Sequence, residues 1–179
     1  MDLQKLYLTT DGRIGRQTWW IGGIIFAVIN LVISLLLLPI MGLGGPNMAA
    51  LMQAQADPQA IAAMAASAVQ TSAWASLVLF LIFAYPAYCL SVKRRHDKNS
   101  DGKDVLAYFA LTLLLLLVQA FGLGYTMTDV GGVMLPMPSM LFSGLGLITG
   151  IFGIYLLVVL GFLKGTEGDN SYGPDPLRS

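Results

Sequence analysis

The chain has 179 residues and a formal net charge of zero, with 56% hydrophobic and 11% charged residues. Because a soluble domain carries roughly 25% charged residues, this composition argues against a soluble globular protein. The single cysteine, Cys89, excludes an intramolecular disulfide and a CxxC motif for metal or redox chemistry.

The hydrophobic residues are concentrated in four blocks that contain no Lys, Arg, Asp, Glu or His. A helix needs about 20 apolar residues to cross a bilayer, and only helices or closed barrels satisfy their backbone groups in hydrocarbon. The blocks are continuous runs without alternation, which excludes the barrel. We therefore expect an all-α fold, a single membrane domain over residues 1–179 built as an integral bundle of four transmembrane helices, with spans at about 19–40, 73–92, 105–121 and 140–163.

The basic residues fall in alternate segments along the chain. Residues 1–18 contain three Lys and Arg, 41–72 none, 93–104 five, 122–139 none, and 164–179 two. Cytoplasmic loops of membrane proteins carry the excess of Lys and Arg. We therefore expect both termini and the segment 93–104 to lie in the cytoplasm, and the other two connections to lie outside.

The two external connections differ in composition. Residues 41–72 are rich in Met and Ala, which favour helix, so we expect an external helical connection. Asp57 and Pro58 have the residue types of an N-cap and a first helical position, which predicts a helix running from Pro58 toward the next span. Residues 122–139 contain a Gly-Gly pair and two prolines, and we expect them to form a loop.

Polar and small residues within the expected spans leave further functions open. Asn30, Tyr85 and Tyr88 would line the polar cavity of a small transporter or channel. No ionisable residue lies in mid-span, which argues against a proton-coupled pump. Gly146 and Gly150 have the small-xxx-small spacing of close helix contacts, either within the bundle or between two copies of the chain.

The segment 93–104 is a dense run of charge that holds the only histidine. Asp97, Asn99 and Asp101, followed by a glycine, match the first half of an EF-hand calcium loop, D-x-[DN]-x-[DN]-G. The second half fails, because position twelve should be a bidentate Glu and is Tyr108. We expect a solvated turn here rather than a calcium site.

His96 and Asp97 side by side would suit half of a metal site or an acid–base pair. The chain offers no second histidine, and Cys89 lies inside an apolar block. We therefore expect neither a transition-metal site nor a cofactor, and interpret His96 as a loop histidine with local hydrogen bonds. The basic residues of this segment would also attract the head groups of anionic membrane lipids.

The cytoplasmic tail, residues 164–179, is rich in Gly, Pro, Asp and Asn, which favours consecutive turns over helix. Two interpretations are open. Either the tail folds back and pairs with the basic segment 93–104, which is the simpler one, or the two together form a composite site for a small ligand.

Three stretches of the chain are distinctive. They are Gly12-Arg13-Ile14-Gly15-Arg16, then Arg94-Arg95-His96-Asp97 with Ser100-Asp101-Gly102, and Gly165-Thr166-Glu167-Gly168-Asp169-Asn170-Ser171-Tyr172-Gly173-Pro174-Asp175-Pro176. Together they resemble the small bacterial inner-membrane proteins grouped as domain of unknown function 805. The resemblance implies a helical protein of the bacterial inner membrane. Because the family is uncharacterised, it implies no activity.

All three stretches fall on the side assigned to the cytoplasm, so we expect their polar side chains to form one cluster. The candidate site residues are Arg13, Arg16, Arg94, His96, Asp97, Asp169, Asn170, Tyr172 and Asp175.

The function expected from these features is that of a non-enzymatic integral protein of the bacterial inner (plasma) membrane. Its cytoplasmic interaction surface would be built from the segment 93–104, the N-terminal segment and the C-terminal tail. A small transporter or channel is the first alternative, and a membrane enzyme acting on lipids is the second. The expected partners are membrane lipids, together with a protein partner or a second copy of the chain, and no nucleic acid.

Overall fold

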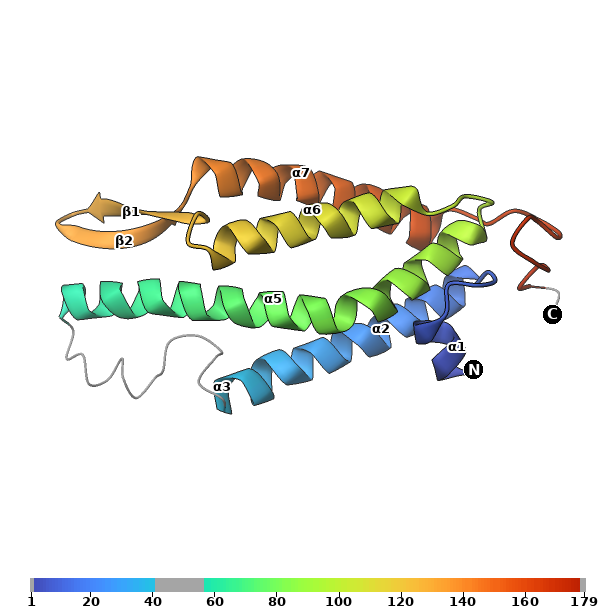
Figure 1. Ribbon diagram of the computed structural model, residues 1–179, viewed down its shortest axis with the longest axis horizontal. Coiled ribbons are helices and arrows are strands. Elements are labelled where there is room, and N and C mark those ends of the chain that lie inside the picture. The colour runs from blue at the N-terminus through green and yellow to red at the C-terminus, as the bar shows by residue number, and fades with distance from the viewer. Residues whose placement is uncertain (1, 41–56, 178–179) are drawn as a thin grey trace. The chain divides into compact units, whose positions relative to one another are not determined.

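The computed structural model describes residues 2–40 and 57–177. It consists of helices and one pair of strands (Figure 1). In chain order the elements are α1 (Leu3–Leu8), α2 (Arg16–Val32), the π-helical turn η1 (Ile33–Leu37), α3 (Leu38–Ile40), α5 (Pro58–His96), α6 (Lys103–Ala120), β1 (Tyr125–Val130), β2 (Val133–Pro138), α7 (Met140–Leu157) and the π-helical turn η2 (Val158–Phe162).

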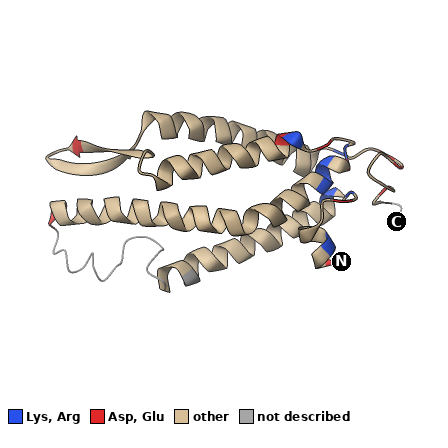
Figure 2. Cartoon of the chain, viewed as in Figure 1, with Lys and Arg blue, Asp and Glu red and all other residues tan. Residues whose placement is uncertain are grey.

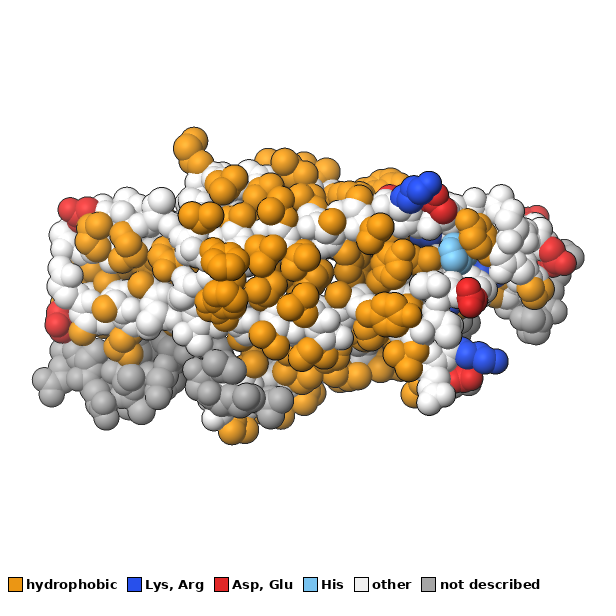
Figure 3. Space-filling view, viewed as in Figure 1, with side chains coloured by type: hydrophobic (Ala, Val, Ile, Leu, Met, Phe, Trp, Pro, Cys, Tyr) orange, Lys and Arg blue, Asp and Glu red, His pale blue; other side chains and the backbone are white. Residues whose placement is uncertain are grey.

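Four helical stretches are long and apolar enough to cross a membrane, namely Arg16–Ile40, Pro58–His96, Lys103–Ala120 and Met140–Phe162. Each overlaps one of the apolar blocks in the sequence, so the expectation of four such helices is confirmed. Large apolar side chains remain exposed along them, and Figure 3 shows hydrophobic side chains over much of the visible helical surface. Exposed apolar surface on this scale suits contact with lipid rather than water.

The longest helix is α5, with 39 residues. Asp57 caps its start, since its Oδ1 accepts the backbone N–H of Gln59 at 3.0 Å and its carbonyl accepts that of Ile61 at 3.0 Å. The helical connection expected between the first two spans is therefore present from Pro58 onward and continues into the apolar block; residues 41–56 lie outside the described residues. At 1.5 Å per residue α5 is about 58 Å long, well beyond the ~30 Å hydrocarbon core of a bilayer.

Residues 125–138 form a β-hairpin, so the expected all-α fold and the expected loop are wrong at this place. Strands β1 and β2 pair antiparallel in a two-stranded sheet. The intervening Gly131 and Gly132 have φ values of 67° and 89°. Positive φ at both central residues is the requirement of a two-residue type I′ turn, which matches the twist of the strands. The prolines of β2 are tolerated because each strand of a two-stranded sheet is an edge.

The chain divides into two compact units. The first, which we call the terminal unit, comprises Met1–Ile29, Leu81–Leu111 and Ile148–Ser179. Its core contains four buried residues, surrounded by the partly buried aromatic residues Trp19, Tyr88, Tyr108, Phe109 and Phe152; the four are Val92, Val105, Leu156 and Leu160. These aromatic rings meet edge-on, as in the Tyr88–Phe109 pair with centroids 6.1 Å apart.

The second unit, which we call the hairpin unit, comprises Asn30–Phe80 and Thr112–Leu147. Its core is formed by Ala73, Leu77 and Ala120, with leucines of α6 packed against them. Gln70 of α5 donates to the carbonyl of Ala120 at the end of α6 and accepts the phenol of Tyr125 at 3.2 Å. These hydrogen bonds tie α5, α6 and the start of the hairpin together.

Charge is unevenly divided between the units. Every described Lys and Arg belongs to the terminal unit, and Figure 2 shows them near the ends of its helices. The hairpin unit contains only Asp57 and Asp129 as charged residues.

The glycines with small-xxx-small spacing are not sites of close packing within the described chain. Apart from the adjoining residues of α7 itself, no described atom lies within 4 Å of a Cβ built at Gly146 or at Gly150. Close approach occurs instead at Gly161, where a Cβ would lie 2.9 Å from the ring of Trp20.

Candidate functional site

The three stretches singled out in the sequence meet in the terminal unit. We call their assembly the polar cap; it comprises residues 2–16, 93–104 and 160–177. All the candidate site residues belong to it, and hydrogen bonds between the three segments hold it together.

Asp97 lies at the centre of the polar cap and is buried. Its Oδ1 accepts from Nε of Arg13 at 2.9 Å, and its Oδ2 pairs with Nη1 of Arg94. Its backbone oxygen accepts both the N–H (2.8 Å) and the hydroxyl (3.0 Å) of Thr166. One residue thus joins the N-terminal segment, the end of α5 and the tail.

Arg94 is fully buried and bound in three directions. Its Nε donates to the carbonyl of Leu160 at 2.8 Å and its Nη2 to that of Leu163 at 2.6 Å, while Nη1 pairs with Asp97. Burial lowers the pKa of the guanidinium, and Asp97 opposes this effect. A buried charge is tolerated only when it is paired and hydrogen-bonded, and Arg94 meets both conditions.

The remaining carbonyls at the end of η2 are bound by side chains of α2. A helix leaves its last four C=O groups without intrahelical partners. Gly161 accepts from Nε1 of Trp20 at 3.1 Å, and Phe162 accepts from Nη1 of Arg16 at 3.1 Å. Together with Arg94, these donors satisfy the end of the helix that contains α7 and η2.

Arg13 connects the N-terminal segment to the backbone of the tail. Its Nη1 donates to the carbonyl of Gly168 at 2.8 Å and its Nη2 to that of Thr166 at 2.6 Å. The tail approaches Asp97 so closely that a Cβ built at Gly165 would lie 2.5 Å from the Asp97 Cγ. Only glycine fits at this position without displacing the central carboxylate.

His96 is buried and held on three sides. Its ring stacks on Tyr172 with centroids 3.9 Å apart and an interplanar angle of 7°. Its Nδ1 lies 3.0 Å from the carbonyl of Gly12, and its own carbonyl accepts from Nδ2 of Asn170 at 2.9 Å. Because a carbonyl only accepts, Nδ1 carries the proton when the ring is neutral. The histidine therefore joins all three segments of the polar cap.

Lys93 is buried and reaches back to α1. Its Nζ donates to the carbonyls of Lys5 and Leu6, the latter at 2.7 Å. Burial lowers the pKa of its ammonium. A cation close to the last turn of a helix is favourable, because the carbonyl end of the helix carries partial negative charge.

The outer basic residues of the segment are also engaged. Nε of Arg95 donates to Oδ1 of Asp104 at 3.0 Å. Nζ of Lys98 donates to the carbonyl of Lys164 at 3.0 Å. Partial burial lowers the pKa of Lys98, and the neighbouring positive charges of Arg94 and Arg95 add to this effect.

Two of the three acidic residues of the tail, Asp169 and Asp175, bind the backbone of the tail itself. Asp169 accepts the N–H of Asp175 at 3.3 Å, and Asp175 in turn accepts those of Gly168 and Leu177, each at 3.0 Å. The basic side chains that bind the tail donate to its backbone carbonyl oxygens. The tail folds back onto the basic segment through its backbone, which the sequence composition did not indicate.

The side chains of the calcium candidate do not converge on one point. Asp97 is occupied by two guanidinium groups, Asn99 accepts the N–H of Ser171 at 3.4 Å, and Asp101 pairs with Nζ of Lys103 at 2.7 Å. Among the described residues, no group of three or more His, Cys, Asp or Glu side chains is placed to hold a metal ion. Only Asn99 and Asp101 of the three are exposed, whereas Asp97 is buried, so the expected solvated turn is present only in part.

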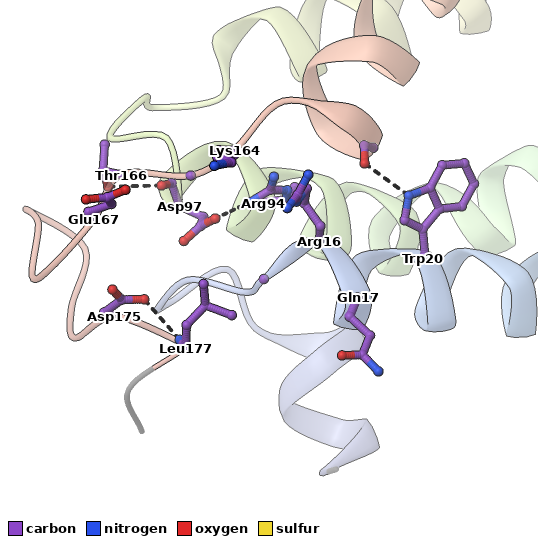
Figure 4. Close-up of a pocket in the computed structure, with 13 residues that line it drawn as sticks. Arg16, Gln17, Trp20, Arg94, Asp97, Lys164, Thr166, Glu167, Asp175 and Leu177 are labelled. Atoms are coloured by element: carbon purple, nitrogen blue, oxygen red, sulfur yellow. Dashed lines mark hydrogen bonds and ion pairs between the residues drawn. The ribbon is translucent and has the colours of Figure 1, made fainter.

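A cavity of about 610 Å³ opens in the terminal unit beside the polar cap. Figure 4 shows the paired Asp97 and Arg94 in its wall, with Arg16 beside Arg94 and Trp20 bonded to a backbone carbonyl. The lining residues come from the start of α2, the end of α5, η2 and the tail, and they are Gly15, Arg16, Gln17, Trp20, Arg94, Asp97, Gly161, Lys164, Gly165, Thr166, Glu167, Asp175 and Leu177.

The fold and this site define a class of protein, mostly helical, with four helices fit to cross a membrane and a polar cap of interlocked charges. The chain matches the family described as Protein of unknown function (DUF805) over residues 7–174, and it belongs to that family. The resemblance found in the sequence is thereby confirmed. Neither a comparison with curated proteins nor one with solved structures gave a match.

Sequence reasoning brought the candidate residues together but missed several that complete the site. Trp20 is one of them, since its indole N–H binds a carbonyl at the end of η2. Gly165 is another, since the absence of a side chain there makes room for Asp97. Lys164 and Glu167 line the cavity, although their charges alone gave no sign of it. The one sequence signal for these missed residues was the Gly-Thr-Glu-Gly segment at the start of the tail.

Proposed function

We propose that this chain is a multi-pass protein of the bacterial inner membrane, with both termini in the cytoplasm, and that it acts by binding rather than by catalysis. The working surface is the cytoplasmic polar cap, and the binding place is its cavity. The cavity is the observation that carries the proposal, because it is a large space lined by charged side chains at the end of apolar helices.

The orientation is supported by the distribution of charge. The segments that form the polar cap contain every Lys and Arg of the chain except Arg178. The two charged residues of the hairpin unit are both acidic. Positively charged connections remain in the cytoplasm during insertion.

The non-enzymatic reading is supported by how the reactive groups are used. Both oxygens of Asp97 face guanidinium groups, and His96 is stacked on Tyr172 with its Nδ1 on a carbonyl. A general base needs an acceptor within reach of a substrate proton. These side chains join parts of the chain to one another instead.

No observation favours a transport function. Tyr85 donates its phenol to the carbonyl of Leu8 at 3.2 Å, and Tyr88 packs in the core of the terminal unit. Neither residue lines the cavity beside the polar cap.

The orientation is tested by single cysteines and a membrane-impermeant maleimide. Glu167→Cys places a thiol at the cavity and Asp129→Cys places one in the hairpin; the native Cys89 is fully buried and gives a low background. We expect the first thiol to react only in inside-out vesicles and the second only in spheroplasts. The opposite pattern would refute a cytoplasmic polar cap.

A further inference from the structure

Several of the charges around the cavity are neutralised by the protein itself. Arg94 and Asp97 form a buried pair, and Arg13 adds a second cation to that carboxylate. Both carboxylate oxygens of Asp175 accept backbone N–H groups of the tail. These groups shape the wall of the cavity and hold it in place.

Other charges around the cavity remain open to a ligand. Within the described residues, the ammonium of Lys164 and the carboxylate of Glu167 have no hydrogen bond or ion pair, although both line the cavity. Arg16 uses one guanidinium nitrogen on the carbonyl of Phe162. The cavity therefore offers two cations and one anion, on separate residues of its wall.

The first turn of α2 adds positive potential at the same place. The first helical hydrogen bond of α2 is donated by Trp19 to Gly15 at 3.1 Å, so the N–H groups of the intervening residues lie ahead of the helical ladder. No side chain caps them within the described chain, whereas Asp2 caps α1 and Asp57 caps α5. Open N–H groups at a helix start favour an anionic oxygen, in addition to Arg16 and the cavity charges.

An apolar surface adjoins the cavity. Trp20 lines it, is 37% exposed, and meets the 60% exposed ring of Phe162 edge-on at 5.8 Å. Both residues belong to apolar helices fit to cross a membrane. A ligand with a charged head and acyl chains satisfies both surfaces, whereas a soluble ion leaves the apolar one uncovered.

The geometry points to a site for a phospholipid with a zwitterionic phosphoethanolamine head group, an inference that rests on the proposed function. The phosphate binds Arg16, Lys164 and the start of α2, and the primary ammonium binds Glu167. The acyl chains lie along Trp20 and Phe162. Glu167 gives the site its preference, because a purely anionic head group leaves that carboxylate without a partner and close to a like charge.

The inference is tested with the full-length protein in detergent by native mass spectrometry. The probes are phosphatidylethanolamine, phosphatidylglycerol and phosphatidylcholine with the same acyl chains, and the soluble glycerophosphoethanolamine. We expect phosphatidylethanolamine to bind about tenfold more tightly than the other two lipids, since a charge-assisted hydrogen bond to a carboxylate is worth about that factor. The quaternary ammonium of phosphatidylcholine cannot donate this bond.

Two variants assign the roles, and a third is the matched control. Glu167→Gln should lower the affinity for phosphatidylethanolamine about tenfold and should not lower that for phosphatidylglycerol, because it removes a charge of the same sign as the lipid. Lys164→Gln should lower the affinities for both lipids by the same factor. Lys103→Gln removes a cation whose side chain is 86% exposed and paired with Asp101 outside the cavity, and it should change neither affinity. Thermal unfolding without lipid verifies that each variant is folded.

Three outcomes would overturn the inference. They are equal retention of all lipids by the unmodified chain, a preference for phosphatidylethanolamine that survives Glu167→Gln, and binding of the soluble head group as tight as that of the lipid. None of them alters the cysteine-labelling pattern, so the lipid site and the cytoplasmic orientation can fail separately.

Discussion

At the scale of single residues, the polar cap depends on Asp97. Its carboxylate is the only partner with opposite charge for the fully buried Arg94 in the described chain, and it also binds Arg13. Asp97→Asn should lower the free energy of unfolding by about 3–5 kcal/mol, because removing one member of a buried pair leaves the other charge unpaired. Denaturant unfolding in detergent measures the change.

The control for this prediction is Asp101→Asn. Asp101 is half-exposed and pairs with Lys103 at the surface, an ion pair that raises the pKa of the lysine and lowers that of the acid. We expect no measurable loss of stability from this variant. If the two variants lost stability equally, the central role of Asp97 would be wrong.

Gly165 has a requirement that its sequence position does not reveal. A Cβ there would overlap the Asp97 carboxylate, so Gly165→Ala should destabilise the chain by about 1–3 kcal/mol, as other overpacked sites do. Gly150→Ala is the matched control, since no described atom lies within 4 Å of its added methyl and alanine favours helix. Thermal unfolding of the two variants should therefore shift in opposite directions, and a shared direction would contradict the contact with Asp97.

Residue types predicted the members of the cluster but not their partners. Arg13, Arg94 and His96 were identifiable because they lie in the three stretches that resemble the family, all on the side assigned to the cytoplasm. Most of their partners are backbone carbonyls, which every residue has, so no side-chain pattern marks them. The last carbonyls of a helix need donors in any fold, but which side chains supply them depends on tertiary packing.

At the scale of elements, the helices were predictable and the hairpin was not. Long apolar blocks must be helical to satisfy their backbone in hydrocarbon, so length and composition suffice. The strands are short, and two prolines in β2 suggested a loop. The Gly131-Gly132 pair between Val130 and Val133 was the signal for a two-residue turn.

The turn provides a prediction at this scale. Gly131 has φ of 67°, a conformation that asparagine tolerates and β-branched residues do not. Gly131→Asn should leave the hairpin intact, whereas Gly131→Val should destabilise it by about 1–2 kcal/mol. Limited proteolysis at residues 125–138 reports the difference. Equal cleavage of the two variants would argue against a type I′ turn.

At the scale of the whole molecule, the tail closes the polar cap. Within residues 165–177, Thr166 donates hydrogen bonds to the carbonyl of Asp97, and two backbone carbonyls accept hydrogen bonds from Arg13. Tyr172 stacks on the ring of His96. A chain ending at Lys164 leaves these buried polar groups without partners, each at a cost of about 1–3 kcal/mol. We expect it to be present at a much lower level in membranes than the full chain.

A chain ending at Leu177 is the control for this truncation. It keeps every described contact of the tail and should accumulate normally. Immunoblots of membrane fractions, with the tag at the N-terminus, compare the two chains. Equal levels would show that the tail is dispensable for the folded state.

The position of Asp97 and Arg94 relative to the tail also imposes an order on synthesis. The ribosome delivers the chain from its N-terminus, so all four apolar helices are complete before the tail leaves the exit tunnel. Until that moment Arg13 lacks the carbonyls of Thr166 and Gly168, and the backbone oxygen of Asp97 lacks the hydroxyl of Thr166. The tail, which is translated after the four apolar helices, thus completes the network, and a chain released before the tail is made leaves the network incomplete.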